Sequence, residues 1–244
     1  MFSMMDWLMS PLSGAAHPGL APWAAWHARC MVLGWGLLLP LGALIARYFK
    51  LTRQPGQPQP LDPKGWWHAH RWLQWLGVAA MSAGAALAWG QAAGASAAAR
   101  AHAWAGWALV LVAWLQVAGG LLRGSKGGPT EPHLRGDHYD MTPRRRAFER
   151  LHKGLGWLAL LASVGVISLG LVLADAPRWM AVTLAAWWGL LAAAAWRWQA
   201  QGRCLDTYQA IWGADTTHPG NRRRPIGWGV RRLLPPDTGR ARHG

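Results

Sequence analysis

Charged residues and cysteines are scarce in this sequence of 244 residues. Charged side chains make up 14% of it, and its two cysteines, Cys30 and Cys204, provide no disulfide framework. Hydrophobic residues make up 52% and 20 residues are tryptophan, whereas tyrosine and phenylalanine number three each. A soluble domain of this size would rarely carry so few charges and so much tryptophan. The composition therefore predicts an integral membrane protein.

Acidic residues are also few, with 10 Asp and Glu against 25 Lys and Arg and a net charge of +15. Such a charge would favour nucleic acid only if it formed a basic face on a soluble domain. Here the cations lie between apolar segments, so we expect membrane lipid as a partner and no nucleic acid. Residues 1–22 lack the basic start of a cleavable signal peptide and contain three prolines, which predicts an interfacial or extended lead-in.

Five apolar segments are long enough to cross a membrane as helices. They are Trp23–Phe49, Trp66–Trp89, Ala98–Leu122, Phe148–Ala174 and Pro177–Trp198. Pro40 predicts a kink in the first. The predicted fold is an all-α integral membrane protein, in which a four-helix bundle is joined by a fifth transmembrane helix. The transmembrane domain covers residues 23–200, and a cytoplasmic, Arg-rich tail covers 201–244.

The cations also predict the orientation of the chain. Of the 25 Lys and Arg residues, 22 fall on one side of the alternating spans; the three others are Arg29, Arg100 and Arg178. Under the positive-inside rule the N-terminus is outside and the tail is cytoplasmic. The two cysteines then lie on opposite sides and cannot pair. We expect a multi-pass protein of a bacterial-type inner (plasma) membrane.

Each of the first four spans has a histidine in its first turn: His27, His70, His102 and His152. An ionisable residue inside a membrane span is by default a functional residue. Because the spans alternate in direction, His27 and His102 share the outer level, and His70 and His152 share the cytoplasmic level. Helices one and three, and two and four, would be diagonals of the bundle. Two facing imidazoles at one level can bind a flat macrocycle such as haem between the helices.

Glycines leave room beside these histidines. Gly106 and Gly156 follow His102 and His152 by one turn, and Gly34 and Gly77 follow the other two by two turns. We therefore interpret these histidines as the iron ligands of two haems, with Gly106 and Gly156 contributing to the binding sites. An iron with two imidazole ligands has no open position, so it transfers electrons and does not bind oxygen.

Simpler interpretations compete with this one. Each histidine could bond a neighbouring helix, and copper or zinc sites are possible in principle, although no Cys, Met or carboxylate joins either pair at ligand spacing. His68 competes with His70 but points about 200° away from it. His133 and His138 with nearby Asp137 and Asp140 could bind a surface metal, although a loop ordered by hydrogen bonds is the more ordinary interpretation. We expect the remaining histidines to be solvated: His17, His218 and His243.

A positive cluster lies where the fourth span enters the membrane. It comprises Arg144–Arg146, Arg150 and Lys153. Such clusters usually bind anionic lipid headgroups and determine which side of the membrane a loop lies on. Together with Arg47 and Lys50, this cluster could also attract an anionic reductant or the haem propionates, and we include Arg47 and Lys50 among the cofactor-binding candidates.

Several of these patterns resemble the cytochrome b561 family, in the version fused or paired to a DOMON domain. The match covers about His27–Ala174. The first span resembles the family's His, a Trp two turns on, Leu-Pro-x-Gly and Ala-Arg-Tyr, here at His27, Trp35, Leu39-Pro40-Leu41-Gly42 and Ala46-Arg47-Tyr48. The next three carry H-x-x-x-Q, H-x-x-x-G with a distal Leu-Gln, and H-x-x-x-G, here at His70 and Gln74, at His102, Gly106 and Leu115-Gln116, and at His152 and Gly156.

The resemblance implies two haem b groups and transmembrane electron transfer, with activity like that of ferric or monodehydroascorbate reductases. It implies an ascorbate-like reductant as donor; a quinol or a periplasmic redox protein are other partners that we consider. The chain has five predicted spans where the family usually has six, and no DOMON domain. The rival functions are a quinol-linked cytochrome and a haem-bearing anchor subunit of a membrane redox complex. A homodimer or a subunit of a complex would both fit.

Overall fold

The computed structural model describes residues 3–14, 19–51, 61–91, 95–127 and 135–232. These residues form helices and two isolated β-bridges, and no strand occurs among them. The elements are α1 (Met4–Met9), α2 (Pro22–Met31), the π-helix η1 (Val32–Leu38), α3 (Leu39–Tyr48), α4 (Gly65–Leu87), α5 (Ala97–Leu121), α6 (Asp137–Asp140), α7 (Pro143–Leu173), α8 (Arg178–Ala200) and α9 (Thr207–Trp212). Since α2, η1 and α3 are continuous, we call them span 1.

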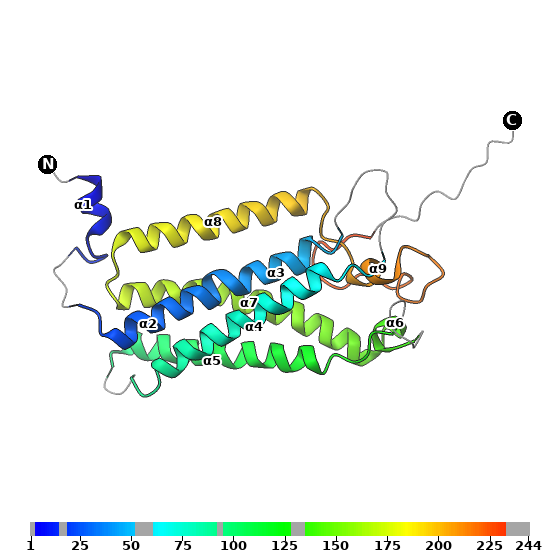
Figure 1. Cartoon of the computed structure of the whole chain (residues 1–244), viewed down its shortest axis with the longest axis horizontal. Coiled ribbons are helices and arrows are strands. Elements are labelled where there is room, and N and C mark those ends of the chain that lie inside the picture. Colours follow the sequence, from blue (N-terminus) through cyan, green and yellow to red (C-terminus); the bar gives the residue numbers. More distant parts are fainter. Residues whose placement is uncertain (1–2, 15–18, 52–60, 92–94, 128–134, 233–244) are drawn as a thin grey trace.

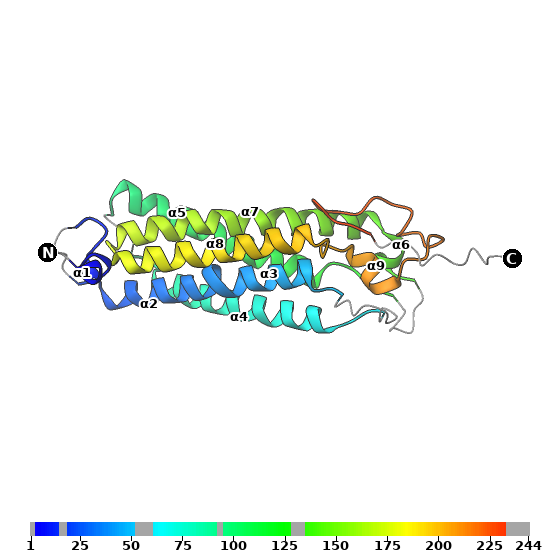
Figure 2. The ribbon, with the colours of Figure 1, turned by 90° about the horizontal axis from the view of Figure 1, so that it is seen from above.

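Within the described residues, four helices are long and apolar enough to cross a membrane: span 1, α5, α7 and α8. The prediction of an all-α membrane protein is therefore confirmed. The second predicted span, α4, has 23 residues and lies alongside the others (Figures 1 and 2), but it is not among these four. Its first half contains His68, His70, Arg71 and Gln74, which lower its hydropathy. That half is also rich in tryptophan.

Span 1, α4, α5 and α7 pack around a common core. Contacts run from span 1 to α4, from α4 to α5, from α5 to α7, and from α7 back to span 1. Span 1 therefore lies diagonally across from α5, and α4 across from α7. The core contains Trp35 and Leu39 of span 1, Met81 of α4 and Ile167 of α7. Helix α8 runs along the outside of this group, as Figure 1 shows.

Span 1 and α4 approach each other closely because glycines meet at their contact. A Cβ added to Gly34 would lie 2.8 Å from the carbonyl oxygen of Gly77, and one added to Gly77 would lie 2.8 Å from Leu39 side-chain atoms. Both distances are shorter than real Cβ contacts. The sequence had suggested that Gly34 and Gly77 leave room for a ligand, but here they allow two helices to pack.

The middle of span 1 departs from α-helical geometry. The π-helix η1 precedes Pro40, which has no N–H to bond the carbonyl of Gly36 four residues earlier. The indole Nε1 of Trp187 in α8 donates to that carbonyl at 3.0 Å. A neighbouring helix thus satisfies the acceptor that proline leaves open, as membrane helices require.

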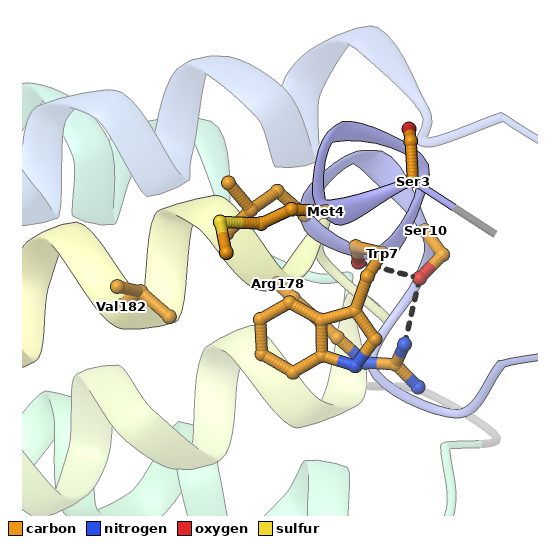
Figure 3. A pocket seen from close by; sticks show the side chains of 7 residues that line it. Ser3, Met4, Trp7, Ser10, Arg178 and Val182 are labelled. Atoms are coloured by element: carbon orange, nitrogen blue, oxygen red, sulfur yellow. Dashed lines mark hydrogen bonds between the residues drawn. The ribbon is translucent and has the colours of Figure 1, made fainter.

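The lead-in contains a short helix and packs against α8. Ser3 caps α1, and the Arg178 guanidinium of α8 donates to the Ser10 hydroxyl at 2.7 Å and lies over the Trp7 ring (Figure 3). A cleft between α1 and α8 is lined by these residues together with Met4 and Val182. Part of the lead-in is therefore helical, and not extended.

Candidate functional site

The rings of His27 in α2 and His102 in α5 face each other across the bundle. Their centroids are 6.1 Å apart and their planes are 74° apart. Two imidazoles bound to opposite faces of one metal ion, each by a bond of about 2 Å, would have centroids roughly 6 Å apart. The distance therefore leaves room for one metal ion between the two rings.

The rings of His70 in α4 and His152 in α7 form a second pair at the other end of the bundle. Their centroids are 6.3 Å apart and their planes are 85° apart. His68 is exposed on another side of α4, as its position two residues before His70 predicts. The structure therefore brings together both pairs of histidines that the sequence singled out.

One histidine of each pair is oriented by a backbone carbonyl. Nδ1 of His27 lies 2.9 Å from the Gly84 carbonyl of α4, and Nδ1 of His70 lies 2.9 Å from the Gly42 carbonyl of α3. A carbonyl can only accept a hydrogen bond, so each Nδ1 carries the proton and Nε2 keeps its lone pair. Histidines that bind metals are typically held in this way.

The other two histidines lie in close-fitting surroundings on α5 and α7. The buried Nδ1 of His152 has no hydrogen-bond partner in the described part of the chain. A Cβ at Gly170 of α7 would lie 3.0 Å from Cε1 of His102, so glycine is what allows this ring its position. Gln116 of α5 donates to the main-chain carbonyl of His152 at 3.0 Å and thereby fixes α5 against α7.

Gly106 and Gly156 border open space. A Cβ at Gly106 would meet no atom within 4 Å, and one at Gly156 would meet only Nε2 of Gln116 at 3.5 Å. Each glycine is one turn from a paired histidine on the same helical face. A flat group could therefore lie against these two helices beside the histidines.

A cavity of about 570 Å³ surrounds the His70–His152 pair. Its volume lies in the range of small-molecule sites, ~300–1,000 Å³. Apolar side chains such as Trp35, Val78 and Leu160 form much of its wall. Cations lie on the same wall: Arg47, Lys50, Arg71, Arg123, Arg145 and Lys153. We call the end of the bundle that contains this cavity the arginine-rich end.

Arg47 and Lys50, both candidates from the sequence, lie on the cavity wall but already have partners. Nη2 of Arg47 donates to Gln199 at 3.1 Å and to the Trp228 carbonyl at 2.7 Å. Lys50 is 5% exposed and donates to the Leu205 carbonyl at 3.0 Å. Burial, followed by the nearby Lys153 ammonium, lowers the pKa of Lys50 to about 8. Arg150 is exposed and does not line the cavity.

In the described part of the chain, no third His, Cys, Asp or Glu side chain joins either histidine pair. Among the described residues, no three His, Cys, Asp or Glu side chains gather as a metal site would require. Zinc and copper normally need three or four protein ligands, whereas a porphyrin supplies four nitrogens of its own. Two histidines alone therefore fit an iron porphyrin better than a bare ion.

The proposed surface metal site in the 124–146 loop is not formed by its described members. Asp137 accepts from Ser125 and Thr142, and Asp140 accepts from Arg135. His138 is 1% exposed and packs on Tyr208 of α9. His133 lies outside the described residues, as do His17 and His243. The described residues of this loop, 124–127 and 135–146, are thus held by hydrogen bonds and charge pairs, which is the more ordinary of the two interpretations.

The prediction that His218 is solvated is wrong. Its ring packs against three aromatic rings, those of Tyr139, Tyr208 and Trp212. The cause is that the tail folds back onto the loop, so a histidine in a polar, Arg-rich stretch finds an aromatic environment.

Acidification should loosen this aromatic region. Burial, followed by the nearby Arg145 guanidinium, holds the pKa of His138 well below its ordinary 6.5. His138 of the unfolded chain therefore binds a proton near pH 6.5, whereas His138 of the folded chain stays neutral there. The free energy of unfolding consequently falls as the pH drops below that value. We expect faster hydrogen exchange in residues 137–140 and 207–212 at pH 5.5 than at pH 7.5, after correction for intrinsic rates.

His138→Phe is the matched control, because it keeps an aromatic ring against Tyr208 and removes the titrating group. The excess exchange at pH 5.5 should then largely disappear. An equal pH response in the parent and in His138→Phe would show that another group is responsible.

The groups that hold the histidine rings could not be identified from the sequence alone. The Gly42 and Gly84 carbonyls and Gly170 belong to helices other than those of the histidines they contact, and a single sequence does not pair such positions. The sequence does contain a pattern that predicts the helix α9 in the tail. Asp206 caps α9 and precedes the apolar Tyr208 and Ile211, which is a recognisable helix start.

Comparison with known proteins adds no relative. No family model, no curated protein and no solved structure matches this chain.

Proposed function

We propose that this protein is a membrane cytochrome that transfers electrons across the bilayer through two haem b groups. His27 and His102 would hold one haem, and His70 and His152 the other. The observation that carries the proposal is the presence of two facing imidazole pairs at opposite ends of one bundle, each at a distance suited to a shared metal ion.

The surroundings of the pairs support haem in particular. Each pair has one ring whose Nδ1 proton is held by a backbone carbonyl, which would leave Nε2 to bind the iron. Gly106 and Gly156 leave open space on the adjoining helical faces. Cations on the cavity wall, including Arg71 and Arg123, can meet the carboxylates of a haem.

The chemistry of this site would be electron transfer alone. Bound between two imidazoles, haem iron supplies reversible one-electron chemistry and offers no position to oxygen. The chain's own residues orient the rings, because the Gly84 and Gly42 carbonyls accept from Nδ1 of His27 and His70. The apolar core containing Leu109, Ala113 and Met81 fills the bundle and separates the two pairs.

The finer points of the proposal concern orientation and partners. If α4 crosses the bilayer as a fifth span, the positive-inside rule places the arginine-rich end in the cytoplasm and the N-terminus outside. The membrane would be of the bacterial inner type. The patterns shared with the cytochrome b561 family favour an ascorbate-like donor. The apolar cavity beside His70 and His152 also suits a quinol, which makes a quinol-linked cytochrome the second candidate.

The direct test is to count haem in the purified protein. We expect about two haems per chain, low-spin and non-covalently bound, because each pair supplies two axial ligands and the sequence has no C-x-x-C-H motif. Pyridine-haemochrome quantification measures the number, and acid–acetone extraction should remove all haem from the polypeptide.

Reduction by ascorbate or by a quinol then distinguishes the two candidate donors. Protein that takes up no haem in cells or on reconstitution, while remaining folded and monodisperse, would disprove the proposal.

A further inference from the structure

The tail returns to the arginine-rich end of the bundle and closes the cavity there. Figures 1 and 2 show α9 and the segment after it beside α6, beyond the ends of α3 and α4. Cys204, Thr207 and Val230 of the tail contribute to the wall of the cavity that surrounds His70 and His152. Residues 203–231, which we call the cover, therefore provide part of the cavity wall at this end of the bundle.

Hydrogen bonds connect different parts of the cover to one another. Its two ends pair as neighbouring backbone segments, because the Arg231 N–H donates to the Cys204 carbonyl and the Asp206 N–H donates to the Arg231 carbonyl, both at 2.8 Å. Arg232, the next residue, donates to the Asp206 carboxylate at 2.8 Å and to the Asn221 carbonyl at 2.8 Å. These bonds join the beginning, the middle and the end of the segment to one another.

Cations of the cavity wall hold the cover to the bundle. Lys50 donates to the Leu205 carbonyl at 3.0 Å, Lys153 to the Ile226 carbonyl at 2.5 Å, and Arg47 to the Trp228 carbonyl at 2.7 Å. All three side chains also line the cavity. The same cations thus face the cavity and bind the segment that closes it.

Two glycines with positive φ lie next to the residues of the cover whose carbonyls accept these bonds. Gly227 and Gly229 have φ of +117° and +64°, which side-chain-bearing residues rarely adopt. They alternate with Ile226 and Trp228, whose carbonyls accept from Lys153 and Arg47. The acceptors are neutral peptide oxygens, and these bind cations less strongly than carboxylate or phosphate oxygens do.

We propose that residues 203–231 form a releasable cover over the cavity of the His70–His152 pair, held closed by Arg47, Lys50 and Lys153. The cover opens when the hydrogen bonds from these cations to the carbonyls of residues 205, 226 and 228 break. Its meaning for electron transfer rests on the proposed function, since the cover would then control access to the haem at this end. Its existence depends only on the contacts described above.

Cys204 provides a reporter of opening, because it is 1% exposed and belongs to both the cover and the cavity wall. In a Cys30→Ser background it is the sole cysteine. Lys50→Met and Arg47→Met each remove one bond to the cover. We expect each change to speed the reaction of Cys204 with N-ethylmaleimide at least about tenfold, the typical factor for loss of one charge-assisted hydrogen bond. The full-length protein is measured before haem is added.

Two controls separate opening from general loosening. Arg150→Met makes the same kind of change at an exposed position outside the cavity wall and should leave the rate unchanged. In a Cys204→Ser background, Cys30 at the opposite end of the bundle should react at the same rate with and without Lys50→Met. Equal acceleration of both cysteines, or no acceleration of Cys204, would overturn the cover. Because no haem is present, failure of the haem proposal would leave this result intact.

Discussion

His70→Ala and His152→Ala are expected to remove or alter the same haem and to leave the other haem unchanged. The ring centroids are 6.3 Å apart, so under the proposed function each change would remove one of the two axial ligands of the same iron. Bound haem should fall from about two to about one per chain, or the affected haem should become high-spin with one ligand left. Haem quantification and electron paramagnetic resonance spectra of the purified variants measure both outcomes.

The other pair provides the reciprocal measurement. His27→Ala and His102→Ala should affect only the second haem, and the double change should leave about one haem per chain. Combining His27→Ala with His70→Ala should damage both. His68→Ala is the matched control, because His68 is exposed on the same helix as His70, and it should keep both haems low-spin. If the His27→Ala, His102→Ala double variant damaged both haems equally while the protein stayed folded, the pairing would be wrong.

Gly106→Leu and Gly156→Leu are each expected to exclude one haem without disturbing the protein that lacks it. The added side chains meet open space at Gly106 and a single ordinary contact at Gly156, so the helices have little reason to move. The same side chains would occupy the room beside His102 and His152 that a flat ligand needs. Each variant should bind about one haem instead of two, with thermal unfolding of the haem-free protein within about 1 kcal/mol of the parent.

Gly154→Leu is the control for Gly156→Leu. Gly154 also has no neighbour within 4 Å of an added Cβ, but it is two residues from His152 and therefore points to another side of α7. It should leave both haems in place. Full haem content in Gly106→Leu and Gly156→Leu would mean that the open space does not belong to the binding sites.

The sequence was sufficient for the helices and for the level of each histidine. Apolar length predicted the helices within a few residues, and the alternating direction of the chain predicted which histidines meet. The start of α7 was missed by five residues, because Thr142 and Pro143 form a helix start within a stretch dominated by arginine. Arg145, which the predicted start at Phe148 left outside the span, therefore lies within the helix itself.

What the sequence could not predict depends on contacts between distant segments. Gly34 and Gly77 have the spacing of glycines that leave room, yet each is filled by the neighbouring helix. Lys50 has the position of a membrane-surface cation, but the tail buries it. In both cases the partner lies at least 38 residues away along the chain, and a single sequence does not show which distant positions are in contact.

The bond from His27 to the Gly84 carbonyl and the bond from His70 to the Gly42 carbonyl also determine how span 1 is positioned lengthwise against α4. His27 and Gly42 are 15 positions apart in span 1, whereas His70 and Gly84 are 14 positions apart in α4. At about 1.5 Å per residue, the two intervals are ~22 and ~21 Å, so span 1 has one residue more than α4 between the two bonds. The π-helix Val32–Leu38 lies within that interval, and a π turn accommodates an extra residue. The π-helix thereby lets both bonds form at once, and the two bonds hold the two histidine levels at one fixed separation along the bundle.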